Sequence, residues 1–263
     1  MKGLIGIALI SVIAFFACFG PLISGYAYDA IDLASKNQAP SYEHWFGTDE
    51  LGRDLFTRVW QGARISLAVG IAAALIDLFV GIIWGSAAAF ARGRIDEVMM
   101  SIAGIFYAIP TLLIVILLIV VLGTGIVSLV ISLTLLGWIT MARIVRGQVL
   151  QIKHAEFVLA SQALGGGFFH IMRRHLIPNA RGPIFVTLLL TIASVIFMEA
   201  FLSFLGLGVQ APMASWGSMA NEGLPVLPYY PWRLMFPAAL ICLTILAFNL
   251  IGESLDDQAI TQH

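Results

Sequence analysis

The sequence predicts an all-α membrane protein with six transmembrane helices, and three observations lead to this fold class. Hydrophobic residues make up 60% of the 263 residues and charged residues only 11%, well below the roughly 25% of soluble domains. The apolar residues fall into six stretches of about 20 residues or more, the length that crosses a bilayer. Lipid is the natural solvent for so apolar a surface. We therefore expect one multi-pass domain, residues 1–263, in the cell membrane.

The expected spans are bounded by polar loops of different lengths. The first span is long enough to favour a retained helix over a cleaved signal peptide. Gly81 and Gly85 in the second span have the spacing at which another helix can cross closely. The third is interrupted at Ile109-Pro110, where proline predicts a kink. The six spans cover residues 4–23, 65–91, 97–122, 126–150, 182–206 and 233–252.

The distribution of basic residues predicts the orientation. Six spans place both termini on one side of the membrane, and Lys and Arg are enriched on the cytoplasmic side. The side of the termini holds nine of the 14 Lys and Arg residues, which are Lys2, Arg92, Arg94, Arg143, Arg146, Lys153, Arg173, Arg174 and Arg181. The other side holds Lys36, Arg53, Arg58, Arg64 and Arg233. Both termini are therefore expected to be cytoplasmic.

The cytoplasmic segment, residues 151–181, is expected to contain two short helices. The first begins near His154 and ends at Gly165, because glycine accepts the left-handed conformation at a helix C-terminus. The second runs from Phe168 to Ile177 and ends before Pro178.

Small side chains near the end of the first of these helices would let another protein surface approach closely. They are Ala160, Ser161, Ala163 and Gly165. Such a helix can fill a groove on a partner protein, or it can lie on the membrane surface as a connector. The residues alone leave both interpretations open.

Several kinds of chemistry have no support in the sequence. There is no Gly-x4-Gly-Lys-Ser/Thr loop to hold the phosphates of ATP. No CxxC or HExxH pattern suggests a metal site, and Cys18 and Cys242 lie in apolar runs as small hydrophobic residues. The net charge of −1 gives no basic excess for nucleic acid. We expect neither an enzyme nor a cofactor bound by this chain.

One spacing in the cytoplasmic segment is similar to the EAA loop (E-A-A-x3-G-x9-I-x-L-P) of ABC-importer permeases. Leu159 stands where the pattern has Glu, and Glu156 would supply the local negative charge instead. The matching residues are Ala160-Ser161-x3-Gly165-x9-His175-x-Ile177-Pro178, in which Ser161, His175 and Ile177 depart from the pattern.

Two further motifs resemble the oligopeptide/dipeptide permease family. Residues 44–54 read HWFGTDELGRD, and residues 62–67 read GARISL. Residues 199–208 read EAFLSFLGLG, and residues 214–217 read ASWG. In their order along the chain, they most resemble the second of the two permeases in such systems.

The resemblance implies a type I ABC importer permease for peptides in a bacterial plasma or inner membrane. The chain would form half of the translocation pathway. Its partners would be membrane lipid, a second permease subunit, two ATP-binding subunits that hold the ATP, and an extracellular or periplasmic substrate-binding protein. The helix with Glu156, Leu159, Ala160, Ser161, Ala163 and Gly165 would couple to the ATP-binding subunits. Related permeases carry nickel, metal chelates or sugars.

Three charged residues of the first polar run, Asp49, Arg53 and Asp54, can pair locally at the head of the second span. They are either a solvated cap with no ligand role or part of the surface on which the binding protein docks. The aromatic residues of the last external segment are expected to anchor at the membrane interface; they are Trp216, Tyr229, Tyr230 and Trp232.

Asp77 and Glu199 lie inside expected spans, where ionised carboxylates are costly. Either could face the pathway, where a carboxylate suits the charged amino terminus of a peptide, or could make a structural hydrogen bond between helices. An ion-coupled secondary transporter that uses these two carboxylates is an alternative function. A membrane scaffold or receptor that transports nothing is another.

Overall fold

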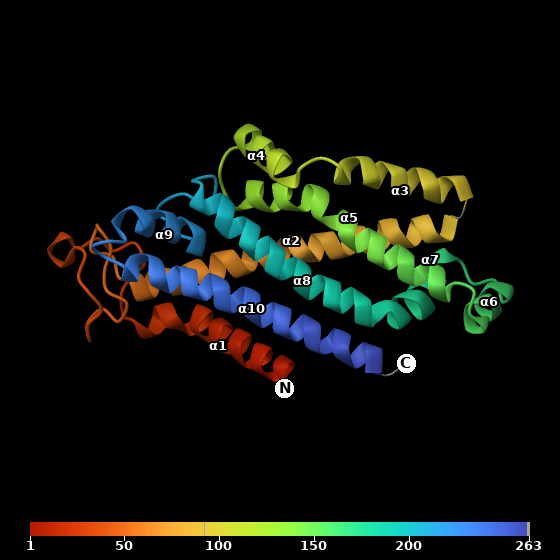
Figure 1. The fold of residues 1–263 in the computed structure, drawn as a ribbon, viewed down its shortest axis with the longest axis horizontal. Helices are drawn as coiled ribbons and strands as arrows, with labels where there is room; N and C mark the ends of the chain where they lie inside the picture. Colours follow the sequence, from red (N-terminus) through yellow and green to blue (C-terminus); the bar gives the residue numbers. More distant parts are fainter. Residues whose placement is uncertain (92, 262–263) are drawn as a thin grey trace.

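The computed structural model describes residues 1–91 and 93–261 as an elongated bundle of helices (Figure 1). Arg92, counted above for the orientation, lies outside these residues. The helices are α1 (Lys2–Ile23), α2 (Leu55–Ala91), α3 (Gly93–Tyr107), α4 (Thr111–Leu122), α5 (Ile126–Ile152), α6 (Glu156–Ala163), α7 (Phe168–Ile171), α8 (Ile177–Phe204), α9 (Trp216–Gly223) and α10 (Trp232–Thr261).

The long helices alternate in direction, so that the connecting segments gather at opposite ends of the bundle. One end, called the α9 end, carries residues 24–54 and α9 (Figure 1). The other, called the α6 end, carries α6 and α7. The first turn of α1 and the last turn of α10 both point toward the α6 end.

Five of the described helices are long and apolar enough to cross a membrane. The pair α3 and α4 would make a sixth span, although the two helices are bent by 77°. The break falls at Ala108-Ile109-Pro110, because Pro110 has no N–H to continue the ladder of α3. The all-α class with six spans and the kink in the third are thus confirmed.

The helix that contains the second expected span begins at Leu55, ten residues before that span. Asp54 makes this start possible, because its Oδ2 accepts hydrogen bonds from Thr57 N at 2.8 Å and from Thr57 Oγ1 at 2.7 Å. A side-chain acceptor of this kind satisfies a free N–H in the first helical turn. The segment with Arg58 and Arg64 is therefore helical, and not a loop as the sequence suggested.

The fifth span also begins earlier, because its helix continues through Pro178. Residues 168–204 form one apolar helical run, within which Met172–Leu176 is a turn of π-helix. The wider turn changes the hydrogen-bond register just before Pro178, which has no N–H to donate. The helix therefore continues through Pro178, and the expected end before this proline is wrong.

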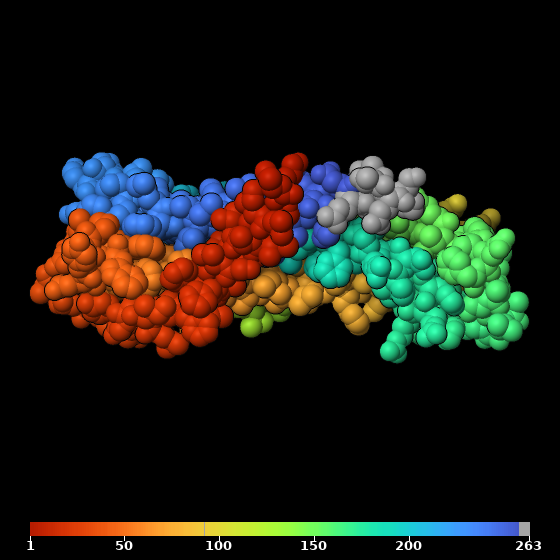
Figure 2. Space-filling model, turned by 90° about the horizontal axis from the view of Figure 1, so that it is seen from below, coloured from red at the N-terminus to blue at the C-terminus, as the bar shows by residue number. Residues whose placement is uncertain are grey.

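The centre of the bundle is the crossing of α2 with α5. A methyl group at Gly81 would lie 2.5 Å from Met141 Cβ, and one at Gly85 would overlap the Ala142 carbonyl oxygen. The expected close helix crossing at these two glycines is thus confirmed. Helix α8 packs against α2, α5 and α10, and α1 runs diagonally along the outside against α10 (Figure 2).

Candidate functional site

At the α9 end, a group of enclosed charges surrounds Asp49. The exposed fractions of Asp49, Arg53 and Arg58 are 1%, 7% and 1%. Asp49 Oδ2 lies 2.6 Å from Arg53 Nε and 3.4 Å from Arg58 Nε. Its Oδ1 accepts hydrogen bonds from the backbone N–H groups of Leu51 and Arg53, at 2.9 and 3.0 Å. One carboxylate therefore closes the turn before α2 and neutralises two guanidinium groups.

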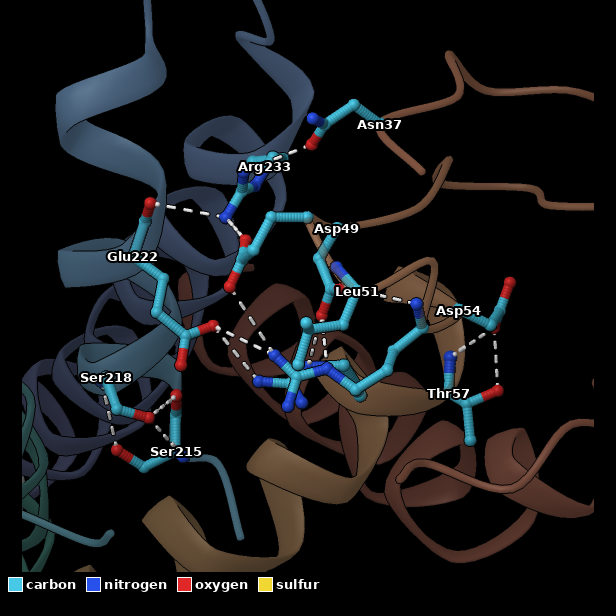
Figure 3. A network of polar contacts seen from close by, with 12 residues as sticks. Asn37, Asp49, Leu51, Asp54, Thr57, Ser215, Ser218, Glu222 and Arg233 are labelled. Carbon is cyan, nitrogen blue, oxygen red and sulfur yellow. Dashed lines mark hydrogen bonds and ion pairs between the residues drawn. The ribbon is translucent and has the colours of Figure 1, made fainter. Parts of the chain in front are cut away.

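The same group extends to α9 and α10 (Figure 3). Arg58 Nη2 donates to Glu222 Oε2 at 3.1 Å. Arg233 donates to Glu50 and to the backbone carbonyl of Glu222, and its Nη1 donates to Asn37 Oδ1 at 3.2 Å. These contacts join the segment of residues 24–54, α2, α9 and α10 into one platform.

Asp54 belongs to a second polar group beside this one. Besides capping α2, its Oδ1 lies 2.9 Å from His44 Nδ1. Nearby in the loop, the Ser35 hydroxyl and the Ala34 N–H donate to Asp32, and these hydrogen bonds lower the pKa of its carboxyl group.

The structure brings Asp49, Arg53 and Asp54 together at the head of α2, but it encloses all three, so they are not a solvated cap. Glu222, which pairs with Arg53 and Arg58, and Arg233, which pairs with Glu50, were not predicted from the sequence. No local signal could have found them, because Arg58 and Glu222 are 164 positions apart and Glu50 and Arg233 are 183 apart.

Trp216 is fully buried, and its expected role as an interface anchor is wrong. Its Nε1 donates to the carbonyl oxygen of Val59 at 3.0 Å, which fastens α9 to α2. Ser215 caps α9 in a reciprocal pair with Ser218. Tyr229, by contrast, is 76% exposed.

Glu199 is fully buried in α8 where α2 and α9 pack against it. Ser203 Oγ donates to Glu199 Oε1 at 2.7 Å, within the same helix. The side chains of Ser66 in α2 and Ser215 also interact with this carboxyl group. The bond from Ser203 lies within one helix, and Glu199 Oε2 has no hydrogen-bond partner among the described residues. The bond between helices therefore stays a prediction.

Asp77 lies at the wall of an open cavity of about 380 Å³ that has exposed residues such as Ile144 and Leu190 in its lining. The lining comes from α2, α4, α5 and α8, and includes Thr140, Thr187, Thr191 and Ser194. Asp77 itself is only 1% exposed, and among the described residues neither of its carboxylate oxygens has a hydrogen-bond partner. Glu199 is not among the lining residues, so the structure does not bring the two membrane carboxylates together.

At the α6 end, α6 projects beyond the spanning helices (Figures 1 and 2). Gly165 ends it with a φ of +85°, as expected. Gly166 N donates to Ser161 O and Gly165 N donates to Gln162 O, both at 2.9 Å. This pair of bonds is the Schellman motif that needs a left-handed residue at the position of Gly165.

One side of α6 is anchored and the other is free. Val158 is fully buried in a hydrophobic cluster with Ile171 of α7 and Leu176. Phe157 and Leu159 are nearly half exposed. Farther along the chain, Leu164 and Phe169 are 90% and 76% exposed. These four residues, called the α6 apolar patch, have no covering element in the described part of the chain.

Two polar contacts brace the helices next to α6. Arg146 of α5 makes a bidentate ion pair with Asp96 of α3, with N–O distances of 2.6 and 2.7 Å. Lys153 Nζ donates to the Ala89 carbonyl oxygen near the end of α2, at 3.0 Å. The end of α5, which leads into α6, is thereby fixed to α2 and α3.

Among the described residues, no group of three or more His, Cys, Asp or Glu side chains could hold a metal ion. Both cysteines are free.

Comparison with protein families gives two matches along the chain. Residues 78–258 match the family described as binding-protein-dependent transport system inner membrane component. Residues 3–40 match the N-terminal transmembrane domain of oligopeptide transport permease C.

Individual relatives agree with these matches. The chain is 55% identical to the oligopeptide transport system permease protein OppC of Bacillus subtilis, over 97% of this chain and 83% of the relative. It is 53% identical to the dipeptide transport system permease protein DppC of the same organism, over 96% of this chain and 79% of the relative.

A solved structure of similar fold is a chain of the MetNI methionine ABC transporter in an inward facing conformation. The TM-score is 0.59 at 19% identity, over 75% of this chain and 96% of that one.

Proposed function

This chain belongs to the family of binding-protein-dependent transport system inner membrane components, and we propose that it is a permease subunit of a bacterial ABC importer for peptides. The observation that carries the proposal is the 55% identity, over 97% of the chain, to a permease named for oligopeptide transport. The relative at 53% identity is named for dipeptide transport, so peptides are the substrate class common to both. The chain is thus a multi-pass permease of the inner membrane.

The α6 end is the proposed contact with two ATP-hydrolysing subunits. The expected coupling residues Glu156, Leu159, Ala160, Ser161, Ala163 and Gly165 all belong to α6 and the turn that ends it. The α6 apolar patch supports this assignment, because a half-buried short helix with free apolar side chains is suited to a groove on a partner. The α6 end and both termini would then be cytoplasmic.

The opposite end would receive the substrate-binding protein. The enclosed ion pairs of Asp49, Arg53 and Arg58 hold the platform in one shape, and they offer little surface of their own. Glu50 and Glu222 lie at the edge of the group, with side chains 39% and 35% exposed. We assign these two carboxylates to direct contact with the binding protein, in place of the enclosed residues Asp49, Arg53 and Arg58.

The bundle between the two ends would form half of the pathway, with a second permease subunit forming the other half. ATP would be bound and hydrolysed on the partner subunits, and this chain would itself be neither an enzyme nor a cofactor-binding protein. Binding and hydrolysis of ATP would move α6, and the braces Arg146–Asp96 and Lys153–Ala89 would transmit that movement to α3, α5 and α2.

Reconstitution tests the proposal. The chain is placed in proteoliposomes with a second permease and two ATPase subunits of the same organism's peptide transport system, with ATP enclosed and the binding protein outside. Radiolabelled tri- to pentapeptides should accumulate inside the proteoliposomes only when both ATP and the binding protein are present.

A collapsed proton or sodium gradient should leave this uptake unchanged. Uptake by the purified chain alone under an ion gradient would show a secondary transporter instead. Uptake of nickel without uptake of peptide would place the chain among the metal permeases.

A further inference from the structure

The geometry around Asp77 points to a binding site for a protonated amine in the open cavity between α2, α4, α5 and α8. This inference rests on the proposed function, because it assigns a place in the pathway to the charged amino terminus of a passing peptide. The cavity of about 380 Å³ is of the size that small-molecule sites usually have.

The carboxylate of Asp77 reaches the cavity because α5 has a glycine beside it. A methyl group at Gly137 would lie 2.7 Å from Asp77 Cγ and 2.8 Å from its Oδ1. Asp77 and Gly137 both line the cavity. Because Gly137 has no side chain, the Asp77 side chain of α2 has room to pass the backbone of α5.

The missing partner of Asp77 is unusual for a buried carboxylate. Both of its oxygens are shielded from solvent and accept no hydrogen bond from the described residues. Buried carboxylates are normally paired or hydrogen-bonded, since leaving them unpaired costs several kcal/mol. Glu199, the comparable residue of α8, has Ser203 for this purpose.

The hydroxyl groups of the cavity favour the same ligand. Thr187 Oγ1 donates to the Pro183 carbonyl oxygen, and Thr191 Oγ1 donates to the Thr187 carbonyl oxygen, both at 2.8 Å. Since these protons are used within α8, the hydroxyl oxygens can act toward the cavity only as acceptors.

No Lys, Arg or His occurs among the described residues that line the cavity. A ligand that donates several hydrogen bonds and carries a positive charge fits this set of acceptors, and an ammonium group does both. Leu133, Ile144, Leu190, Val195 and Met198 complete the lining and would contact the apolar part of the ligand.

Charge-dependent labelling of a cysteine tests the site. Ser194→Cys is introduced into the assembled complex in nanodiscs, with Cys18→Ser and Cys242→Ser removing the native thiols. The rate of modification is measured with aminoethyl methanethiosulfonate, which is cationic, and with sulfonatoethyl methanethiosulfonate, which is anionic. The ratio of the two rates should fall about tenfold when Asp77→Asn is added, because an unscreened charge attracts the cationic reagent.

Glu199→Gln is the matched control, since it removes a buried carboxylate that does not line the cavity. It should leave the ratio unchanged. Protection by ligand gives a second measurement: trialanine amide, which has a free amino terminus, should slow labelling, whereas N-acetyl-trialanine amide should not. Asp77→Asn should abolish the difference between the two peptides.

The amine site would be overturned if Asp77→Asn left the ratio of the two labelling rates unchanged, or if neither reagent modified the cysteine. Equal protection by both peptides would also overturn it. ATP-dependent uptake by the same complex tests the proposed function separately. Uptake without charge-dependent labelling would support the importer function and contradict the amine site. Charge-dependent labelling without uptake would support the site and contradict the importer function.

Discussion

The guanidinium group of Arg64 in α2 satisfies the carbonyl group of Ala17 in α1, with Nε donating to its oxygen at 2.6 Å. In an α-helix, the N–H group four residues later would bond this oxygen, but that residue is Pro21. Arg64 Nη2 also donates to the Cys18 carbonyl oxygen, at 2.7 Å. Arg64 thus supplies from a second helix the donor that Pro21 lacks, and it ties the outer helix α1 to the bundle.

This relationship predicts that Arg64→Leu is destabilising only while Pro21 is present. An unsatisfied buried carbonyl costs about 1–3 kcal/mol, and the free energy of unfolding should fall by that amount. In the double variant with Pro21→Ala and Arg64→Leu, the backbone N–H gained at position 21 can donate to the Ala17 carbonyl oxygen, and most of the loss should be recovered. Equilibrium unfolding in mixed SDS micelles measures both. Equal losses in the single and double variants would contradict the relationship.

The enclosed charges at the α9 end predict a large effect of Asp49→Asn. Arg53 and Arg58 would keep their charges in a closed site without the carboxylate that they share. Removing one partner from a buried ion pair costs about 3–5 kcal/mol, so the apparent melting temperature of the purified complex should fall markedly. The control is Glu253→Gln, which breaks an exposed pair with Lys2 and should cost less than about 1 kcal/mol. Similar shifts in the two variants would argue against enclosure.

The close contact between Gly137 and Asp77 predicts that substitutions at these two positions have non-additive effects on the free energy of unfolding. Gly137→Ala places a methyl group against the Asp77 carboxylate and should lower the free energy of unfolding by about 1–3 kcal/mol, the usual cost of overpacking. Combined with Asp77→Ala, which opens space at the same point, the methyl group should be accommodated. A double-mutant cycle in SDS unfolding gives the coupling energy. Strict additivity would mean that the two residues do not share this space.

The left-handed conformation of Gly165 predicts an order of effects at the end of α6. Gly165→Pro cannot adopt a φ of +85° and should reduce co-purification of the ATPase subunits and uptake, while insertion into the membrane is retained. Gly165→Asn should retain most of both, because asparagine tolerates this conformation. Binding in pull-down assays and uptake are the readouts. Unchanged docking and uptake in the proline variant would remove α6 from the coupling role.

Hydropathy was sufficient to predict the spans, because a lipid-facing helix must be apolar along about 20 residues whatever its tertiary contacts. It failed at the start of α2, where Arg58 and Arg64 lower the local hydropathy. Both charges are satisfied by distant partners, Arg58 by Glu222 of α9 and Arg64 by carbonyl groups of α1. Such partners depend on the tertiary fold and have no periodicity in the sequence.

The residue types of the candidate sites were predictable, but their surroundings were not. Asp77 and Glu199 look alike in the sequence, as single carboxylates in apolar runs. Only the fold distinguishes them: Glu199 has a serine one turn away, and Asp77 opens onto a cavity beside Gly137. Similarly, Trp216 is of the residue type that anchors at a membrane interface, but in the structure it is buried in the core at the start of α9.

Cross-linking tests most directly whether α6 is the contact with the ATPase subunits. Leu164→Cys, at a position 90% exposed beside α6, is compared with Tyr229→Cys, 76% exposed at the α9 end, in chains that carry Cys18→Ser and Cys242→Ser. The assembled complex is treated with a short bismaleimide. We expect Leu164→Cys alone to form a cross-link to an ATPase subunit and to lose ATP-dependent uptake when it does. A cross-link from Tyr229→Cys to that subunit, or none from Leu164→Cys, would contradict the account.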